Sequence, residues 1–381
     1  MNVKAAFPRL APSLAVAASS VGAYLFSSPT ECEKASNDGS SQRQRSRLIF
    51  IGSGSSTGCP RPLCPMVFRS VPDKDASPEL KQMQQDMEPY CRISNMAIDG
   101  DPKDNKNYRN NPSILISHCD ATGECKNVII DVGKTFREGA IRWFPERGIT
   151  SLDGIILTHE HMDAVGGLDD VRGFQKWKDM QALKEGRVKR PYSVPVPVHL
   201  SQSCLDDVSQ RFPWLFPNQQ SPLEQAPSDK PIVERHVASF DIKVFESLKP
   251  FQVEGLVVVP LPVMHGEDLV SFGYAFSVGT TNVVYLSDIS RMLPETLEYI
   301  LQKLPETDVL ILDALHPDKD NAVHFKLEQA VELAQKIRPS QMTYLVGMDC
   351  DSFLPHDEMN AKLRKDYGNV QLAHDGLEIE L

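Results

Sequence analysis

The 381-residue sequence lacks an apolar run of the kind that spans a bilayer, which needs about 20 strongly apolar residues. It also lacks an internal repeat of fixed period and an excess of basic residues, because 40 Lys and Arg stand against 51 Asp and Glu, for a net charge of −11. These absences exclude a multi-spanning membrane protein and count against a general nucleic-acid binder, which usually carries a net basic face. The remaining composition, 41% hydrophobic and 24% charged, is typical of a globular protein.

Regular cysteine spacing is also missing. The chain has eight cysteines, which are Cys32, Cys59, Cys64, Cys91, Cys119, Cys125, Cys204 and Cys350. A chain of this length can bury a large core, so it does not need disulfides for stability. We therefore expect reduced thiols, with a subset available to a metal.

Residues 1–47 are predicted to be a targeting segment followed by a linker. Lys4 and Arg9 precede a short Ala-rich apolar stretch at 11–26, and no acidic residue occurs before Glu31. This pattern is typical of a mitochondrial presequence or of an uncleaved signal-anchor. The alternative is a disordered tail without targeting information on a cytoplasmic protein. No stable membrane span is expected in either case.

From residue 48 to residue 381, predicted strands alternate with predicted helices in a single domain. Two insertions interrupt it, a proline- and charge-rich stretch near 60–111 expected to be irregular, and a basic stretch near 172–192. The distribution predicts an α/β protein with sheet packed on sheet and helices outside. Strands are predicted at 48–51, 113–117, 127–131, 154–158, 194–199, 242–246, 256–261, 273–278, 283–286 and 342–346, and helices at 136–144, 293–304 and 327–337.

The segment after the predicted strand at 154–158 carries the strongest chemical signal. His159 and His161 lie two residues apart, so at a strand end both imidazoles can reach one cation, and Asp163 adds a carboxylate oxygen. The glycine pair at 166–167 lets the backbone bend closely beneath such a cation. The alternative, a solvated loop that happens to hold two histidines, does not explain the aspartate and the glycines.

This pattern resembles the signature of the metallo-β-lactamase superfamily, His-x-His-x-Asp-His after a strand. Asp131 resembles the structural aspartate of that family, His265 its third histidine ligand, and Asp288 the aspartate that usually bridges two metals. The resemblance implies a four-layer αβ/βα sandwich of two mixed sheets with outer helices. It also implies Zn²⁺ or Mn²⁺ held by His159, His161, Asp163, His265 and Asp288.

Within the superfamily, the sequence looks most similar to PhnP-type cyclic phosphodiesterases, which are related to PqqB and tRNase Z. The opening at 50–56 resembles the first strand and loop of that group, and 374–377 resembles its closing strand. Asp313-Ala314-Leu315-His316-Pro317 followed by His324 resembles the segment that supplies its catalytic histidine. The resemblance therefore implies His324 as the general acid.

Two departures from the two-metal pattern concern the second metal site. Ala164 stands where that pattern has a histidine, and Gly347 stands where a later histidine is expected. Only Asp163 and Asp288 remain for the second metal, with His356 as a possible recruit. We therefore expect one firmly bound metal and a second that is weak or absent.

The resemblance also implies a structural zinc. Cys64 and Cys91 resemble zinc-binding cysteines of PhnP-like proteins, and Cys350 takes the place of a histidine ligand there. Ser94 stands where another cysteine would be expected, which leaves Cys59 as one candidate for the fourth ligand. Ordinary buried thiols are the alternative.

The predicted function is that of a metal-dependent hydrolase acting on small or cyclic phosphodiesters through a metal-bound hydroxide. Asp163 would orient or deprotonate the attacking water, and His324 would protonate the leaving alkoxide. One alternative is a tRNase Z-like RNA-processing nuclease, with the basic stretch at 176–190 facing the RNA backbone. Another is a non-catalytic metal-binding scaffold. The sequence leaves the oligomeric state open, with a homodimer as one arrangement.

Overall fold

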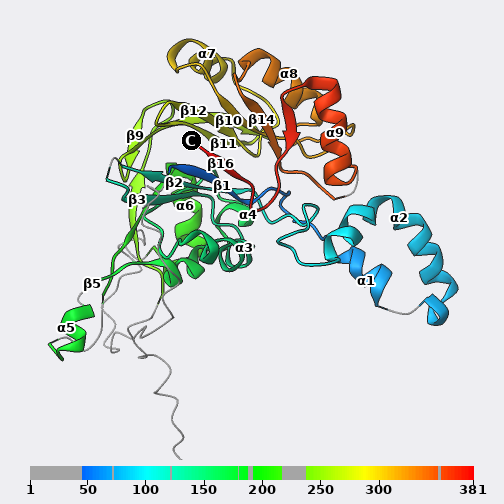
Figure 1. Cartoon of the computed structure of the whole chain (residues 1–381), viewed down its shortest axis with the longest axis horizontal. Helices are drawn as coiled ribbons and strands as arrows, with labels where there is room; N and C mark the ends of the chain where they lie inside the picture. Colours follow the sequence, from blue (N-terminus) through cyan, green and yellow to red (C-terminus); the bar gives the residue numbers. More distant parts are fainter. Residues whose placement is uncertain are drawn as a thin grey trace, which may run out of the picture. The chain divides into compact units, whose positions relative to one another are not determined.

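The computed structural model describes residues 45–70, 73–120, 122–178, 180–187, 192–216, 237–350 and 353–381. In these residues two seven-stranded mixed sheets are accompanied by helices, which confirms the predicted sandwich (Figure 1). Most of the predicted targeting segment and linker, residues 1–44, lies outside the described residues. The first strand begins at Arg47. Among the described residues, no helix has the length and apolar character needed to cross a membrane.

The first sheet combines an antiparallel half with a parallel half. Its β1 pairs antiparallel with β16 and β2, and β2 with β3, while β3, β4, β7 and β8 run parallel. The spatial order is β16 (Glu378–Glu380), β1 (Arg47–Gly52), β2 (Ser113–Cys119), β3 (Cys125–Ile130), β4 (Gly154–Ile156), β7 (Val196–Leu200) and β8 (Phe240–Val244).

The second sheet repeats this division. Its β12 to β15 run parallel, and β9 to β12 pair antiparallel. The spatial order is β15 (Val370–Leu372), β14 (Met342–Val346), β13 (Val309–Asp313), β12 (Thr281–Leu286), β11 (Leu269–Val278), β10 (Leu256–His265) and β9 (Phe251–Val253). A small ribbon pairs β5 (Trp177–Lys178) with β6 (Tyr192–Ser193).

The core between the sheets follows from the two-residue period of a strand. In β1, Leu48 and Phe50 point into the apolar layer between the sheets, while Ile49 and Ile51 point into the layer under the helices. All four are buried, so this strand reads as a continuous apolar run rather than an alternating one. Tyr274 of β11 lies in the same layer, and its hydroxyl donates to the Leu157 carbonyl, which follows β4.

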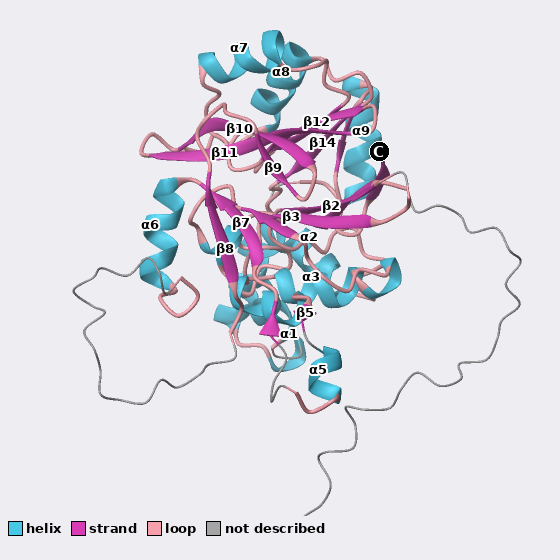
Figure 2. Cartoon of the chain, turned by 90° about the vertical axis from the view of Figure 1, so that its left-hand side faces the viewer, coloured by secondary structure: helices cyan, strands magenta, loops and turns pink. Residues whose placement is uncertain are grey.

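Helices cover the outer faces of both sheets (Figures 1 and 2). Those on the first sheet are α3 (Phe136–Trp143), α4 (Met162–Val165) and α6 (Gln202–Arg211), with short 3₁₀ turns at Pro145–Arg147 and Leu168–Phe174. Those on the second sheet are α7 (Pro294–Lys303), α8 (Leu327–Ile337) and α9 (His356–Tyr367). The basic insertion contains α5 (Met180–Lys184).

The insertion near 60–111 is helical, so the expectation of an irregular segment was wrong. It contains α1 (Leu63–Arg69), a 3₁₀ turn (Asp73–Asp75) and the 21-residue α2 (Pro78–Ile98). The Ser77 side chain accepts the Leu80 N–H as an N-cap, and Pro78 occupies the first turn, where its missing N–H costs nothing. Proline interrupts a helix in its interior, but at the first position it favours a helix start.

The prediction of reduced thiols was wrong for one pair. Cys119 and Cys125 form a disulfide across the hairpin of β2 and β3. They are directly opposite each other in the antiparallel register, which brings their side chains to the same face. The remaining described cysteines are free and buried, namely Cys59, Cys64, Cys91, Cys204 and Cys350.

Candidate metal centre

The predicted metal-binding residues lie where strands of both sheets end. His159 and His161 follow β4, and His161 is the N-cap residue of α4. His265 is the last residue of β10, and Asp288 follows β12. Since these strand ends meet at one edge of the sandwich, residues more than 100 positions apart in sequence come together there.

Three imidazoles converge at this edge. Ring centroids lie 4.6 Å apart for His159 and His161, and 5.2 Å apart for His265 and each of the other two. One nitrogen from each ring lies within 4.8 Å of the others, a separation that one metal ion can bridge. His159 and His265 are buried, whereas His161 is exposed. The structure thus brings together the three histidines that the sequence pointed to.

The hydrogen bond at Nδ1 of His159 determines the tautomer of this ring. The Thr158 hydroxyl donates to Asp131 (2.8 Å), so its oxygen accepts from Nδ1–H of His159 (2.8 Å). Nε2 of His159 then carries a lone pair, and it is buried with no hydrogen-bond partner in the described part of the chain. Burial lowers the pKa of His159 to about 3, which keeps the ring neutral. A buried, neutral nitrogen without a partner is the donor that a metal ion requires.

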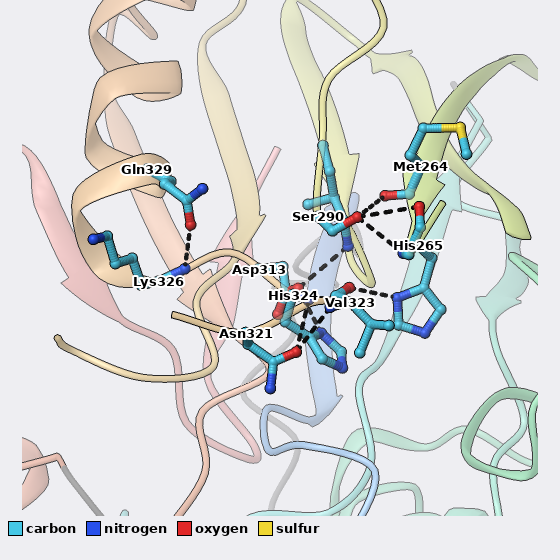
Figure 3. A network of polar contacts seen from close by, with 11 residues as sticks. Met264, His265, Ser290, Asp313, Asn321, Val323, His324, Lys326 and Gln329 are labelled. Atoms are coloured by element: carbon cyan, nitrogen blue, oxygen red, sulfur yellow. Dashed lines mark hydrogen bonds and ion pairs between the residues drawn. The ribbon is translucent and has the colours of Figure 1, made fainter. Parts of the chain in front are cut away.

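His265 is oriented in the same way by a different partner. Its Nδ1–H donates to the backbone carbonyl of Val323 at 2.7 Å (Figure 3). A carbonyl only accepts hydrogen bonds, so Nδ1 carries the proton and Nε2 offers its lone pair. Two of the three imidazoles are therefore oriented with Nε2 available to a metal ion.

Two aspartates near the imidazoles have positive φ angles. Asp131 has φ 63° and Asp288 has φ 51°, a region that non-glycine residues rarely occupy. Burial raises the pKa of Asp131 well above its usual value, opposed by the hydrogen bonds from Thr158. Asp163 and Asp288 are buried, and such carboxylates are normally paired or bound to a metal.

A close backbone approach places Asp163. A Cβ on Gly133 would lie 1.8 Å from the carbonyl oxygen of Asp163, so only glycine fits there. Val132 N–H donates to the Ala164 carbonyl at 2.7 Å. Ala164 itself is buried in the apolar layer under the helices, so the position where the two-metal pattern has a histidine is part of the core.

His324 forms a second group with part of the first. One ligand atom from each of His265, Asp288 and His324 lies within 4.8 Å of the others. His324 is buried, and its Nδ1 lies 2.7 Å from Asp313 Oδ2. Burial disfavours a charged His324, but the negative charge and hydrogen bond of Asp313 outweigh it and raise the pKa of His324 to about 9. Protonated His324 can therefore act as a proton donor at neutral pH.

The space next to Gly347 is filled by Asp313, the hydrogen-bond partner of His324. Gly347 has φ 77°, and a Cβ there would lie 2.1 Å from Asp313 Oδ1. A histidine at this position would collide with the carboxylate that orients His324. Glycine at position 347, in place of the histidine of the two-metal pattern, thus leaves room for the Asp313–His324 pair.

His356 lies elsewhere, in a separate polar cluster. Its Nε2 accepts from the Asn360 amide at 3.0 Å, and its ring centroid lies 5.3 Å from that of His374. In the described residues, His356 belongs to neither of the groups that could hold a metal ion. This placement gives no support to its recruitment to a second metal site.

The predicted zinc-binding cysteines gather away from this centre. The Cys59 thiol donates to Cys350 and lowers the pKa of Cys350, and Cys64 and Cys91 form a second hydrogen-bonded pair. Arg109 is fully buried beside Cys59 and Cys350, and its Nε and Nη2 have no hydrogen-bond partner in the described part of the chain. A buried guanidinium needs counter-charges; Asp375 and Asp349 act on Arg109, and thiolates on a divalent cation would add to them. The four sulfurs fit zinc by donor type, although no three of them lie within 4.8 Å of one another, as the histidine nitrogens do.

Sequence reasoning missed the residues that orient the ligands. Thr158 and Val323 act through hydrogen bonds that depend on the folded geometry, and the Val323 carbonyl lies 58 positions from His265 in the sequence. The pairing of Asp313 with His324 was not predicted either. An acidic residue at the end of an apolar run, shortly before a histidine, was the available signal.

Comparisons with known proteins agree with this geometry. A family profile described as a beta-lactamase superfamily domain matches residues 126–345. The crystal structure of a diphosphatase from the PhnP family is 26% identical and covers 88% of this chain and 98% of its own, with a TM-score of 0.59. Zn²⁺-bound PqqB from Methylobacterium extorquens is 15% identical and covers 88% of this chain and 100% of its own, with a TM-score of 0.57, which bears on the fold alone.

One relative of known name belongs to a different class of enzyme. An octanoyltransferase from Porphyromonas gingivalis (strain ATCC BAA-308 / W83) is 26% identical over 340 residues, covering 87% of this chain and 51% of the relative. The chain thus spans about half the length of this relative. The family profile matches more than half of the chain. The chain therefore belongs to the metallo-β-lactamase superfamily and resembles its PhnP-like members.

Proposed function

We propose that this protein is a metal-dependent hydrolase of phosphodiesters. The observation that carries the proposal is the convergence of three imidazoles, two of them held by hydrogen bonds with Nε2 free for a metal ion. His159, His161, His265 and Asp288 would hold the metal, with zinc or manganese as candidates. One cation per centre is expected, because positions 164 and 347 offer no further ligand.

The residues around the centre suit hydrolysis of a phosphate ester. A divalent cation held there would lower the pKa of a bound water towards about 7 and polarise a phosphoryl oxygen. Asp163 would orient or deprotonate the attacking water. His324, held by Asp313, would give its proton to the leaving alkoxide oxygen.

Three substrate classes are compared. A small or cyclic phosphodiester has a poor alkoxide leaving group, which a general acid such as His324 assists. A diphosphate is the second candidate, because the 26% identical PhnP-family protein is called a diphosphatase. Its phosphate leaving group is a weaker base and needs less help from an acid. The relative named octanoyltransferase makes an acyl thioester worth including as a third substrate.

The test replaces a ligand that is exposed. His161→Ala should leave the fold intact, because this side chain faces solvent, while metal content and turnover fall together. The matched control is His118→Ala, a half-buried histidine in β2. Turnover would be measured on bis-p-nitrophenyl phosphate, a 2′,3′-cyclic nucleotide, a diphosphate and a thioester, with added zinc or manganese.

The outcomes separate the alternatives. Unchanged turnover of His161→Ala would contradict the proposal. Bound metal without turnover of any substrate would favour a non-catalytic scaffold, and salt-sensitive binding of tRNA would favour an RNA-processing nuclease. Cleavage of only the diphosphate would correct the substrate class while leaving the metal centre in place.

We also propose that Cys59, Cys64, Cys91 and Cys350 bind a structural zinc. The support is their burial as free thiols, with Cys59 and Cys350 beside a buried guanidinium, that of Arg109, whose Nε and Nη2 have no hydrogen-bond partner among the described residues. Cys350→Ser should remove one zinc per chain and destabilise the attachment of α1 and α2, with catalytic metal retained. Cys204→Ser, at a buried cysteine in α6, is the control. Equal zinc content in both variants would refute the proposal.

A further inference from the structure

The loop between β13 and α8 carries His324 and is closed at its base. Leu315 N–H donates to the Phe325 carbonyl at 2.9 Å, and Leu327 N–H donates to the His316 carbonyl at 2.8 Å. These bonds fix the two ends of the loop against each other. They do not by themselves set the direction of the peptide groups at its tip.

The Asn321 side chain fixes the backbone conformation at the tip of this loop. Its side-chain oxygen accepts from the backbone N–H of Val323 at 2.9 Å and from that of His324 at 3.2 Å (Figure 3). One amide oxygen thus holds two consecutive peptide groups, as asparagine does in turns. The direction of both peptides follows from this single side chain.

Each of these residues then orients one part of the centre. The Val323 carbonyl receives Nδ1–H of His265 at 2.7 Å, which leaves Nε2 of that ring free for the metal. His324 turns its Nδ1 to Asp313 at 2.7 Å. The same Asp313 oxygen accepts the Ile289 N–H at 3.2 Å, directly after the metal-binding candidate Asp288.

We propose that Asn321 is a positioning residue that orients the metal ligand His265 and the proton donor His324 together. The inference rests on the proposed function of the centre. Metal affinity at His265 and proton donation by His324 are then coupled through the side-chain oxygen of Asn321. If Asn321 only stabilised a turn, replacing it would lower folding stability without a specific loss of metal affinity or of proton donation.

The experiment compares Asn321→Ala with Asn321→Asp, which keeps an acceptor oxygen at the same place. The matched control is Ala322→Ser at the exposed neighbouring position. Affinity for Co²⁺ alone would be measured by its visible absorption in competition with a chelator, since partners behind a metal ligand typically change affinity by about 10- to 100-fold. Turnover would be compared for p-nitrophenolate and alkoxide leaving groups. Thermal unfolding would be recorded for all variants.

Asn321→Ala should bind Co²⁺ about tenfold more weakly and lose more turnover with alkoxide than with p-nitrophenolate leaving groups. Asn321→Asp should recover most of both losses. Asn321→Ala with the Co²⁺ affinity and leaving-group ratio of Ala322→Ser would overturn the inference, as would equal losses in the Ala and Asp variants. Failure of the unmodified protein to bind Co²⁺ or cleave any diester would instead overturn the proposed function.

Discussion

The proton-donor role of His324 can be tested by replacing Asp313 with asparagine. The change removes one negative charge but keeps an acceptor oxygen for Ile289 N–H, which the carboxylate now binds at 3.2 Å. The pKa of His324 lies at about 9 because the charge and hydrogen bond of Asp313 outweigh burial, against 6.5 for an ordinary histidine. That difference corresponds to about 3 kcal/mol in favour of the protonated ring.

Without the carboxylate, burial is left to disfavour the charged ring, so the pKa of His324 should fall to 6.5 or below. At pH 8 the protonated fraction would drop from about nine-tenths to about 3%, a loss of about 30-fold in the active form. The alkaline limb of kcat for a diester with an alkoxide leaving group should therefore move from near pH 9 to below pH 7. A p-nitrophenolate diester should lose less than about threefold, since its leaving group needs no proton.

The assay is the pH dependence of kcat for both substrates in the metal-loaded protein. His324→Gln serves as the reference for complete loss of the acid. An alkaline limb that stays in place in Asp313→Asn, or equal losses for the two leaving groups, would refute the proton-donor role. Metal content measured on the same samples separates that result from loss of the cation.

The remaining predictions concern stability and location. Gly347→Ala should lower the free energy of unfolding in urea by at least about 1 kcal/mol more than Gly368→Ala. Both glycines have similar positive φ angles, but only at position 347 would the new Cβ collide with another group, the Asp313 carboxylate. Equal losses of unfolding free energy in the two variants would contradict this close packing. Burial lowers the pKa of His356 to about 3, so the unfolded state binds more protons below pH 6.5 and stability falls as the pH falls. His356→Gln should remove about 2 kcal/mol of the stability lost between pH 7 and pH 5, as read from urea midpoints, and an unchanged slope would contradict this. Residues 1–47 fused to a fluorescent protein should carry it to mitochondria, and a diffuse cytoplasmic signal would contradict the targeting prediction.

Much of the sheet core could be predicted from the sequence because its signal is local. The predicted ranges 327–337 and 342–346 match α8 and β14, where apolar residues recur at the period of each element. The strand β13 was not predicted, although Val309–Asp313 is a short apolar run of the kind found in buried parallel strands. α2 could not be predicted because it contains Pro78 and Pro89, and proline within a segment usually indicates the end of a helix.

The residues of the candidate centre could be predicted, but their orientation could not. His159 and His161 were predicted from their place after a strand, and His265 and Asp288 from the resemblance to the superfamily; all four lie at or just after strand ends. The bond from His265 to the Val323 carbonyl depends on the path of a loop whose sequence shows no period. The disulfide between Cys119 and Cys125 likewise requires the hairpin register, which places them opposite each other.

Anomalous diffraction at the zinc edge from crystals of the intact protein would locate the metal itself. We expect a peak bound by Nε2 of His159 and of His265 and by a ring nitrogen of His161, each at about 2.0–2.1 Å. A zinc-loaded crystal with no anomalous peak among these three rings would contradict it.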